Sequence, residues 1–384
     1  MRFSRLTYSL AAVFLCYGAV VFAFGPCLTS MADTFGVPVG RLGLLFTLYA
    51  VGLIPSVLLN GYLSEVIGRR LIMLGTIGMM ALGCALFGLI VTIGGPRSFP
   101  LALAAMVLLG YGGGGIEILT NVLIADDNQP APAFALNVTH AFFAIGAVLS
   151  PLGVSLLLRS DLPWQLVFYA TAALMVVLLL VLLPQRMPSA TGEPFSPLAA
   201  LSLLKSPLIW LLLAMIAFYV GAEMGVSAWV GPLMETVLRT PRDVAGLSVS
   251  VFWAFMIVGR FIVGPLSVRF RPPPLLFVLA LGSSLSSLAV AYATDSTRCL
   301  IAAGAAGLFM SGIFALVLVD ASRHFPKRLG PVFGIITAGV GVGSLIVPAA
   351  MGWISEVAGL RAAMFVPVGL MGAVALAYLA RWSR

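Results

Sequence analysis

Long apolar segments, each about the length of a membrane-spanning helix, alternate along this chain with short polar segments. A helix needs roughly 20 apolar residues to cross the hydrocarbon core of a bilayer. The sequence predicts twelve such spans: 8–30, 42–63, 71–93, 100–124, 132–157, 164–184, 207–231, 244–267, 274–294, 299–319, 331–353 and 360–381. No stretch shows the alternation of a β-strand, so we expect an all-α membrane protein.

The positions of lysine and arginine predict how these spans are oriented. An even number of spans places both termini on the same side of the bilayer. Thirteen basic residues fall in segments on the side of the termini and seven on the other side. Because cytoplasmic loops carry the excess of Lys and Arg, we expect both termini to be cytoplasmic, in a plasma (bacterial inner) membrane.

The composition agrees with a membrane protein and argues against other classes. Hydrophobic residues make up 61% of the chain and charged residues 9%, whereas soluble domains carry about 25% charged residues. The net charge of +8 comes from short loops between spans, so we expect no nucleic-acid partner. The four cysteines are scattered and suggest neither a disulfide framework nor a metal site. We expect no cofactor and no metal.

The longest connection, residues 185–206, divides the chain into two halves with related patterns. We predict a six-helix bundle at 1–184, a cytoplasmic linker at 185–206 and a second six-helix bundle at 207–384. At an offset of 203 residues, Gly61 matches Gly264 and Glu117 matches Asp320. Transporters are commonly built from such repeated halves, so we expect two pseudo-symmetric bundles.

A short charged segment joins the second and third predicted spans, and we expect a tight turn there. It reads Gly61-Tyr62-Leu63-Ser64-Glu65-Val66-Ile67-Gly68-Arg69-Arg70, and a weaker copy containing Arg269 follows at 264–271. Its charged groups can bridge neighbouring helices in one conformation and release them in another, as alternating access requires. We predict a gating role for Gly61, Glu65, Gly68, Arg69, Arg70 and Arg269. The alternative is that the arginines only hold the loop in the cytoplasm.

Two acidic residues lie inside predicted spans, whereas the other eleven of the thirteen fit loops or span ends. A charged acid at the bilayer centre costs roughly 2.5–3.5 kcal/mol on insertion scales, and burial favours the neutral carboxyl. Glu117 and Glu223 are therefore suited to carry a proton beside a water-filled path. The alternative is a structural hydrogen bond to a neighbouring helix. Four glycines precede Glu117, and we interpret most of them as sites of close helix packing.

Amide, imidazole and indole groups in the spans are candidates for solute binding. Asn121 follows Glu117 by four residues and shares its helix face, while Asn137 and His140 share one face of the fifth span. These three side chains can offer hydrogen bonds to a cavity, although His140 could instead cap a backbone carbonyl.

Two tryptophans in the second half are further candidates for solute binding, and one arginine there is a further candidate for gating. The indoles of Trp229 and Trp253 could stack on a sugar ring, with core packing as the alternative. Arg260 falls inside the eighth span, and we expect it to pair with an acid or a helix end near the cytoplasmic gate.

The segment from Gly61 to Arg70 resembles the loop motif Gly-x-Leu-Ala/Ser-Asp/Glu-x-x-Gly-Arg-Arg/Lys of the major facilitator superfamily. The twelve spans, the central loop and the weaker second copy agree with this resemblance over the whole chain. It implies a secondary active transporter with two six-helix bundles that works by alternating access.

Within that superfamily, segments 136–146, 219–229 and 252–260 resemble the fucose:proton symporter-like branch. Glu117 and Asn121 fall where that branch often has an acid and an amide. The resemblance implies transport of a sugar or polyol with a proton, and it adds Tyr219 to the expected substrate-binding residues. Two features depart from the branch: residues 17–31 contain no acid, and residues 146–153 partly resemble a motif of proton-driven exporters.

We therefore expect a proton-coupled symporter for a small hydrophilic solute, with a monosaccharide as the first candidate. The proton is expected ahead of sodium, and the fold needs no second copy to form a pathway, so we expect a monomer. A proton-coupled drug or metabolite exporter is the alternative with the same fold, and a non-transporting receptor or scaffold is the alternative from another class. An enzyme is not expected, because no nucleophile–base pair or metal cluster is evident.

Overall fold

The structure is a computed structural model that describes residues 3–128, 132–188, 203–325 and 329–382. The chain forms two compact units, Met1–Pro194 and Phe195–Arg384. In the described ranges every regular element is a helix. Most of the predicted linker, residues 185–206, lies outside the described residues.

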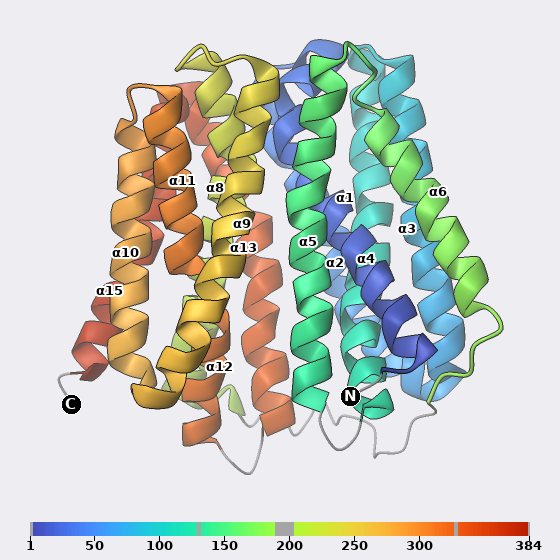
Figure 1. The fold of residues 1–384 in the computed structure, drawn as a ribbon, viewed down its shortest axis with the longest axis vertical. Coiled ribbons are helices and arrows are strands. Elements are labelled where there is room, and N and C mark those ends of the chain that lie inside the picture. Colours follow the sequence, from blue (N-terminus) through green and yellow to red (C-terminus); the bar gives the residue numbers. More distant parts are fainter. Residues whose placement is uncertain (1–2, 129–131, 189–202, 326–328, 383–384) are drawn as a thin grey trace. The chain divides into compact units, whose positions relative to one another are not determined.

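Six long helices make up the first unit (Figure 1). They are α1 (Arg5–Phe35), α2 (Gly43–Leu63), α3 (Arg69–Ile93), α4 (Phe99–Asp127), α5 (Pro132–Arg159) and α6 (Leu166–Leu182). Short 3-10 turns at Val39–Leu42 and Pro96–Ser98 precede α2 and α4, and a π-helical segment, Ser64–Gly68, joins α2 to α3.

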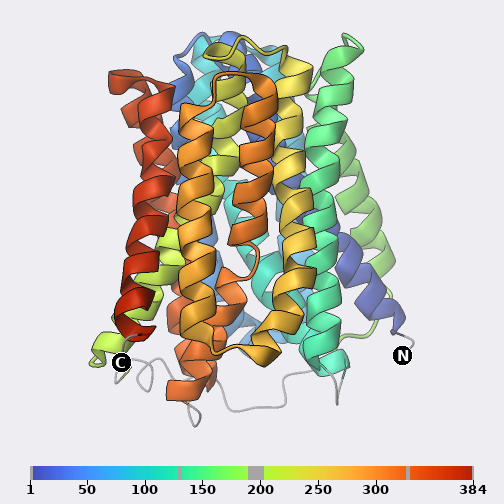
Figure 2. The same ribbon diagram turned by 60° about the vertical axis from the view of Figure 1, so that its left-hand side comes forward.

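The second unit repeats this arrangement with two divided spans. Its helices are α8 (Pro207–Thr236), α9 (Arg242–Arg269), α10 (Pro272–Tyr292), α11 (Ser296–Met310), α12 (Ile313–His324), α13 (Leu329–Ala358), α14 (Leu360–Ala363) and α15 (Phe365–Trp382). Helices α11 and α12 are two parts of one apolar span, Ser296–Ala321, and Figure 2 shows the break between them.

Among the described residues, eleven helical segments are long and apolar enough to cross a membrane. The apolar helix Leu166–Leu182 is the twelfth and the shortest, with 17 residues, which is at the lower limit of what spans the hydrocarbon core. Each predicted span coincides with one of these segments. The predicted fold class is therefore confirmed.

Local sequence accounts for where several of these helices begin and end. Ser4 caps α1, because its side-chain oxygen accepts a hydrogen bond of 3.0 Å from the backbone N–H of Thr7. Gly36 ends α1 with φ +63°, a conformation that glycine adopts without steric cost. Pro207 and Pro272 are the first residues of α8 and α10, where the missing N–H of proline is not needed.

The predicted tight turn at 61–70 is wrong in extent, because most of this segment is helical. Helix α2 continues to Leu63, the π-helical segment follows, and α3 begins at Arg69. The non-helical conformation is concentrated at Gly68, which has φ +112° and would strain any residue with a Cβ. A π-helical segment keeps its backbone hydrogen bonds, and no simple apolar periodicity signals it.

Helix pairs in the first unit touch through their backbones at glycines. A Cβ added at Gly110 of α4 would lie 1.8 Å from the carbonyl oxygen of Tyr49 in α2. A Cβ added at Gly146 of α5 would lie 2.0 Å from the carbonyl oxygen of Leu15 in α1. Small residues allow such close approach, on which helix association in membranes depends. The pairs α2–α4 and α1–α5 are the closest-packed scaffold of this unit.

The second unit uses the same device at the equivalent pairs. A Cβ added at Gly343 of α13 would lie 2.2 Å from the carbonyl oxygen of Ala217 in α8. A Cβ added at Gly307 of α11 would lie 2.0 Å from the carbonyl oxygen of Phe252 in α9. In order of spans, α8, α9, α11 and α13 correspond to α1, α2, α4 and α5. The two bundles are thus related in packing as well as in sequence.

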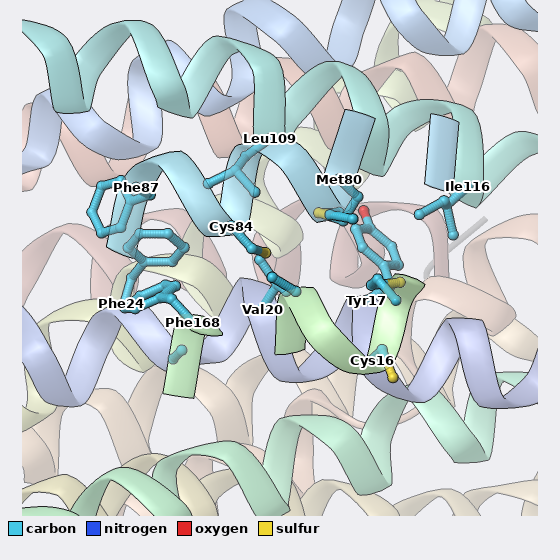
Figure 3. Packing of buried hydrophobic residues seen from close by; sticks show 14 of the residues in the cluster. Cys16, Tyr17, Val20, Phe24, Met80, Cys84, Phe87, Leu109, Ile116 and Phe168 are labelled. Atoms are coloured by element: carbon cyan, nitrogen blue, oxygen red, sulfur yellow. The ribbon is translucent and has the colours of Figure 1, made fainter. Parts of the chain in front are cut away.

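An aromatic cluster in the core of the first unit leads toward the polar residues described below. Figure 3 shows Phe24 of α1, Phe87 of α3 and Phe168 of α6 together. Their ring centroids lie 4.9–5.1 Å apart. Tyr17 and Met80 continue this layer along α1 and α3.

Replacing Gly110 by alanine should push α2 and α4 apart, because the new methyl group would overlap a backbone carbonyl. We expect a loss of about 1–3 kcal/mol in stability and a lower Tm of the purified protein. Gly75→Ala in α3 is the matched control, because nothing lies within 4 Å of its added Cβ; there we expect an unchanged or higher Tm. Equal melting of the two variants would contradict the backbone contact.

Candidate functional site

A hydrogen-bonded chain of three predicted site residues crosses from α4 to α5 in the first unit. Helix α4 places Glu117 and Asn121 one turn apart. The Asn121 amide donates to the backbone oxygen of Glu117 at 2.9 Å and to its carboxylate Oε1 at 3.3 Å. The amide oxygen of Asn121 lies 3.0 Å from Nε2 of His140 on α5. A change at the carboxyl group can therefore reach the imidazole through one amide.

Aromatic rings of α1 and α5 form a cluster beside His140. The ring of Phe14 packs edge-on against the imidazole, with centroids 5.1 Å apart. Phe143 contacts both Phe14 and Tyr17, at centroid distances of 5.6 and 5.3 Å. The imidazole and the amide thus lie next to an apolar aromatic wall.

Side chains and backbone of α1, α2 and α3 pack against the glycine run before Glu117. A Cβ at Gly113 would lie 2.4 Å from the Tyr49 hydroxyl and 2.9 Å from the Tyr17 ring. The packing interpretation of the run is confirmed. Because Gly113 precedes Glu117 by one turn, the Tyr49 hydroxyl is held near the acid. This hydroxyl is buried and lies beside the hydroxyl of Tyr17.

The second predicted acid, Glu223, lies in α8 of the other unit and is only 6% exposed. Tyr219, one turn earlier, is also buried, and its hydroxyl donates a hydrogen bond to the Glu223 carboxyl. The positive charge of Arg260 on α9 acts on this carboxyl. Glu117, by contrast, is only half-buried.

The expected pairing of Arg260 with an acid is wrong for the described residues. Its side chain is exposed, forms no ion pair with them, and its Nη2 lies 3.9 Å from the sulfur of Met256. The acid within electrostatic reach, Glu223, is buried and already bonded to Tyr219. The spacing along α9 could not show that this acid was engaged elsewhere.

Both candidate tryptophans are fully buried in the second unit. The indole N–H of Trp229 donates to the backbone oxygen of Pro348 in α13 at 3.3 Å. Trp253 packs edge-on against Phe252, with centroids 5.9 Å apart. These contacts favour a packing role for Trp229. The predicted solute-binding residues therefore form two groups, one in each unit.

Two predicted residues have backbone positions but no described side chain. Asn137 lies in α5 and Glu65 in the π-helical segment, and the side chains of both lie outside the described part. Gly61 sits where an added Cβ would be 3.8 Å from Ile118 of α4. Arg269 is exposed in the last turn of α9.

Polar contacts tie together the helix ends around the predicted gating segment. Arg69, only 7% exposed, forms an ion pair with Asp126 at the end of α4. Arg70 donates to the backbone oxygen of Leu183, next to α6. Sequence reasoning did not select Asp126, although its place at the end of a span that packs against α3 made it a candidate.

The same end of the first unit carries two further contacts between helices. The Thr7 hydroxyl of α1 donates to the Asp127 carboxylate at 2.7 Å. The Gln185 side chain donates to the Ser9 hydroxyl at 3.0 Å. Polar contacts thus join the start of α1 and α3 to the end of α4 and to the residues that follow α6.

Sequence reasoning missed a buried ion pair in the second unit. Asp320 of α12 is 2% exposed, and its carboxylate lies 2.8 Å from the guanidinium of Arg381 in α15. Arg381 also lies over the ring of Tyr378, 5.5 Å from its centroid. The available signal was the repeat, which matches Asp320 to the intramembrane Glu117. By position alone, Asp320 belongs with the acids at span ends.

No group of three or more potential metal ligands occurs among the described residues. All four cysteines are buried and free. The donors near Glu117 and Glu223 are instead hydrogen-bonding amide, hydroxyl and imidazole groups.

Two repeated helical units with acids inside their spans define an integral membrane transporter. The family model described as Major Facilitator Superfamily matches residues 10–297 and 217–384. The chain belongs to the major facilitator superfamily. It is therefore a transporter of small molecules and not an enzyme.

Similar proteins extend over nearly the whole chain. The Protein TsgA homolog of Erwinia tasmaniensis is 25% identical over 374 residues, which cover 94% of this chain and 90% of that protein. A crystal structure of a D-xylose-proton symporter has a TM-score of 0.82 and 16% identity, covering 98% of this chain and 96% of the other. A structure of the E. coli fucose:proton symporter FucP has a TM-score of 0.68 and 18% identity, covering 98% of both chains. At these identities the two solved structures establish a shared fold.

Replacing Arg381 by glutamine should leave the buried Asp320 carboxylate without its cation. We expect a loss of about 3 kcal/mol in stability, measured as a lower Tm. Arg298→Gln is the control, because the Arg298–Asp295 pair is 71% and 49% exposed and such pairs contribute about 0–1 kcal/mol. If both variants melt like the unmodified protein, the buried pair is not stabilising.

Proposed function

We propose that this transporter is a proton-coupled symporter of a small hydrophilic solute of the monosaccharide class, working by alternating access. The observation that carries this proposal is the hydrogen-bonded chain from Glu117 through Asn121 to His140, beside the aromatic wall of Phe14 and Phe143. It combines a group that can take a proton with groups that can hold a polyol.

Glu117 is the proposed proton carrier of the first unit. It lies within a span, is half-buried, and forms no ion pair with a described residue. An ionised carboxylate in this setting is costly, and protonation removes the charge. A protonated carrier can therefore enclose its solute without burying a net negative charge. We propose the proton and not sodium, because Asn121 offers this acid a hydrogen-bond donor and not a further ligand oxygen.

The groups next to Glu117 suit a sugar. Amides and imidazoles exchange hydrogen bonds with hydroxyl groups in both directions, and aromatic rings provide flat apolar surfaces for the carbon face of a sugar ring. The two structures described above are of symporters named for D-xylose and fucose, which supports the same solute class here. The proposed contributors to solute binding from the second unit are Tyr219, Trp253 and Trp229. Trp229 is the weakest candidate, because its indole N–H is bonded to Pro348.

The polar contacts at the helix ends of the first unit are proposed to stabilise one conformation of the alternating cycle. The ion pair between Arg69 and Asp126 would form in that conformation and break in the other, with Gly68 and Arg70 as parts of the same gate. Arg269 would serve the equivalent place in the second unit. We place both termini in the cytoplasm, in a plasma (bacterial inner) membrane, and propose a monomer.

Replacing Glu117 by glutamine should separate solute exchange from proton movement. In proteoliposomes, we expect sugar addition to drive proton uptake in the unmodified protein and at least about tenfold less in Glu117→Gln, while exchange of labelled for unlabelled sugar persists. A panel of D-xylose, L-fucose and D-galactose provides the probes, and Asp295→Asn, in an exposed loop, is the control. Sugar uptake that ignores the pH gradient in the unmodified protein would remove the coupling proposal.

Replacing Asn121 by alanine should weaken sugar binding, because it removes the amide that joins Glu117 to His140. Losing a hydrogen bond to a charged group typically costs 1.5–3 kcal/mol, so we expect the KM for transported sugar to rise by roughly 10-fold or more. Asn128→Ala is the matched control: Asn128 also bonds a carbonyl one turn earlier, but it bonds Thr7 and not an intramembrane acid. An equal rise in KM for both variants would argue against a special role for Asn121.

The rival readings give different results in the same assays. Stabilisation of the purified protein by lipophilic cations, and not by sugars, would favour a proton-coupled drug or metabolite exporter. Solute binding without flux in sealed vesicles would favour a non-transporting receptor.

A further inference from the structure

Arg260 is a cation inside a membrane span without an acid bound to it. It lies in the span Arg242–Ser267, seven residues before the end, which corresponds to about 10 Å along a helix axis. Its side chain is exposed and contacts the sulfur of Met256. It forms no ion pair within the part of the chain that the structure describes.

The chemistry of arginine limits what can accompany it there. A guanidinium stays protonated in proteins, so it cannot lose its charge to suit an apolar environment. Within a span, such a charge needs water or an anion. Its planar set of N–H donors matches the two oxygens of a carboxylate.

Other arginines that reach into the second unit are already occupied. Arg381 is paired with Asp320, and Arg361 donates to the backbone oxygens of Ala291 and Ala293 at 2.9 and 2.8 Å. Arg260 differs from both in having its donors accessible.

Glu223 is the acid on which Arg260 acts. It lies on the neighbouring helix α8, buried, with Tyr219 bonded to it. Among the described residues, no other charged group acts on Glu223 from the helices packed against α8. The other titratable and charged groups on those helices are Arg242, Asp243, Arg269, Arg298, Cys299, Asp320, Arg323, His324, Glu356, Arg361, Tyr378 and Arg381. The carboxyl of Glu223 and the exposed guanidinium of Arg260 therefore form a two-charge system on the neighbouring helices α8 and α9.

We propose that Arg260 binds a carboxylate group of the transported solute, so that a sugar acid is preferred over the matching neutral sugar. This inference rests on the proposed function as a proton symporter. While Glu223 is ionised, its charge and that of the solute compete for one cation. When a proton binds a carboxylate oxygen of Glu223, the competitor becomes neutral and the solute anion replaces it. One proton then accompanies each monoanion, and the net charge of the site is unchanged.

Matched pairs of neutral and acidic sugars test this with the full chain, purified in detergent. D-glucuronate and D-galacturonate differ from D-glucose and D-galactose by a carboxylate in place of a hydroxymethyl group. By titration calorimetry, we expect each uronate to bind at least about tenfold more tightly than its neutral partner, as expected for a carboxylate held by arginine. We also expect tighter uronate binding at pH 6 than at pH 8, because protonation of Glu223 removes its competition.

Three variants separate the charge of Arg260 from general damage. Arg260→Gln should remove the preference for uronates, and Arg260→Lys should retain part of it, because lysine keeps the charge but not the paired donors. Glu223→Gln should make uronate binding at pH 8 equal to that at pH 6. Arg298→Gln, which removes an exposed positive charge, should leave every affinity unchanged.

Two results would overturn the anion site. The first is that the unmodified protein shows no preference for uronates, and binding of none of the four probes counts as this result. The second is that Arg260→Gln shows the same preference as the unmodified protein. The comparison in the unmodified protein needs no variant to fold. If uronates bind through Arg260 but drive no proton uptake in proteoliposomes, the site stands and the symport proposal falls. If neutral sugars drive equal proton uptake in the unmodified protein and Arg260→Gln, symport stands and the anion site falls.

Discussion

The cost of leaving a charge without a partner away from water is the constraint on which this structure depends. Charged groups that support the scaffold are satisfied by opposite charges, as in the pair of Asp320 with Arg381. The intramembrane acids are satisfied differently, by neutral donors: Asn121 for Glu117 and Tyr219 for Glu223. A neutral donor supports the carboxylate less than a cation would. The type of partner therefore distinguishes groups that hold the helices together from groups that can change charge during transport.

A second constraint is that lipid provides no hydrophobic force to press apolar helices together, so close contact must come from shape. In both units this is achieved at glycines that face backbone carbonyls, in α1–α5 and α2–α4 and in their equivalents α8–α13 and α9–α11. Each pair of helices is joined by more than one such contact. The two helices of a pair are therefore suited to move together as one rigid body. The glycine run before Glu117 extends this packing to the polar chain, since it holds Tyr17 and Tyr49 next to the acid.

The sequence was sufficient for features that depend on length and local pattern. Apolar stretches fixed the number and order of spans, because any helix in lipid must satisfy its own backbone. The positions of Glu117, Asn121 and His140 followed from helix geometry and family resemblance. Contacts between distant helices were not visible: Asp320 meets a partner 61 residues later (381 − 320), and Asp126 meets one 57 residues earlier.

The expectation for Arg260 failed for a related reason. A pattern along one helix identifies a cation in a span, but not whether the nearest acid is already engaged, as Glu223 is by Tyr219. The prediction of a tight turn at 61–70 failed because the non-helical conformation is confined to one residue, Gly68, between helical segments.

The double hydrogen bond of Asn121 has one more consequence. Its amide nitrogen faces the backbone oxygen of Glu117, an atom that only accepts, so the amide cannot turn over. Its oxygen must then face His140, and the imidazole has to keep a hydrogen on Nε2. The tautomer of a histidine in α5 is thus set by the main chain of α4.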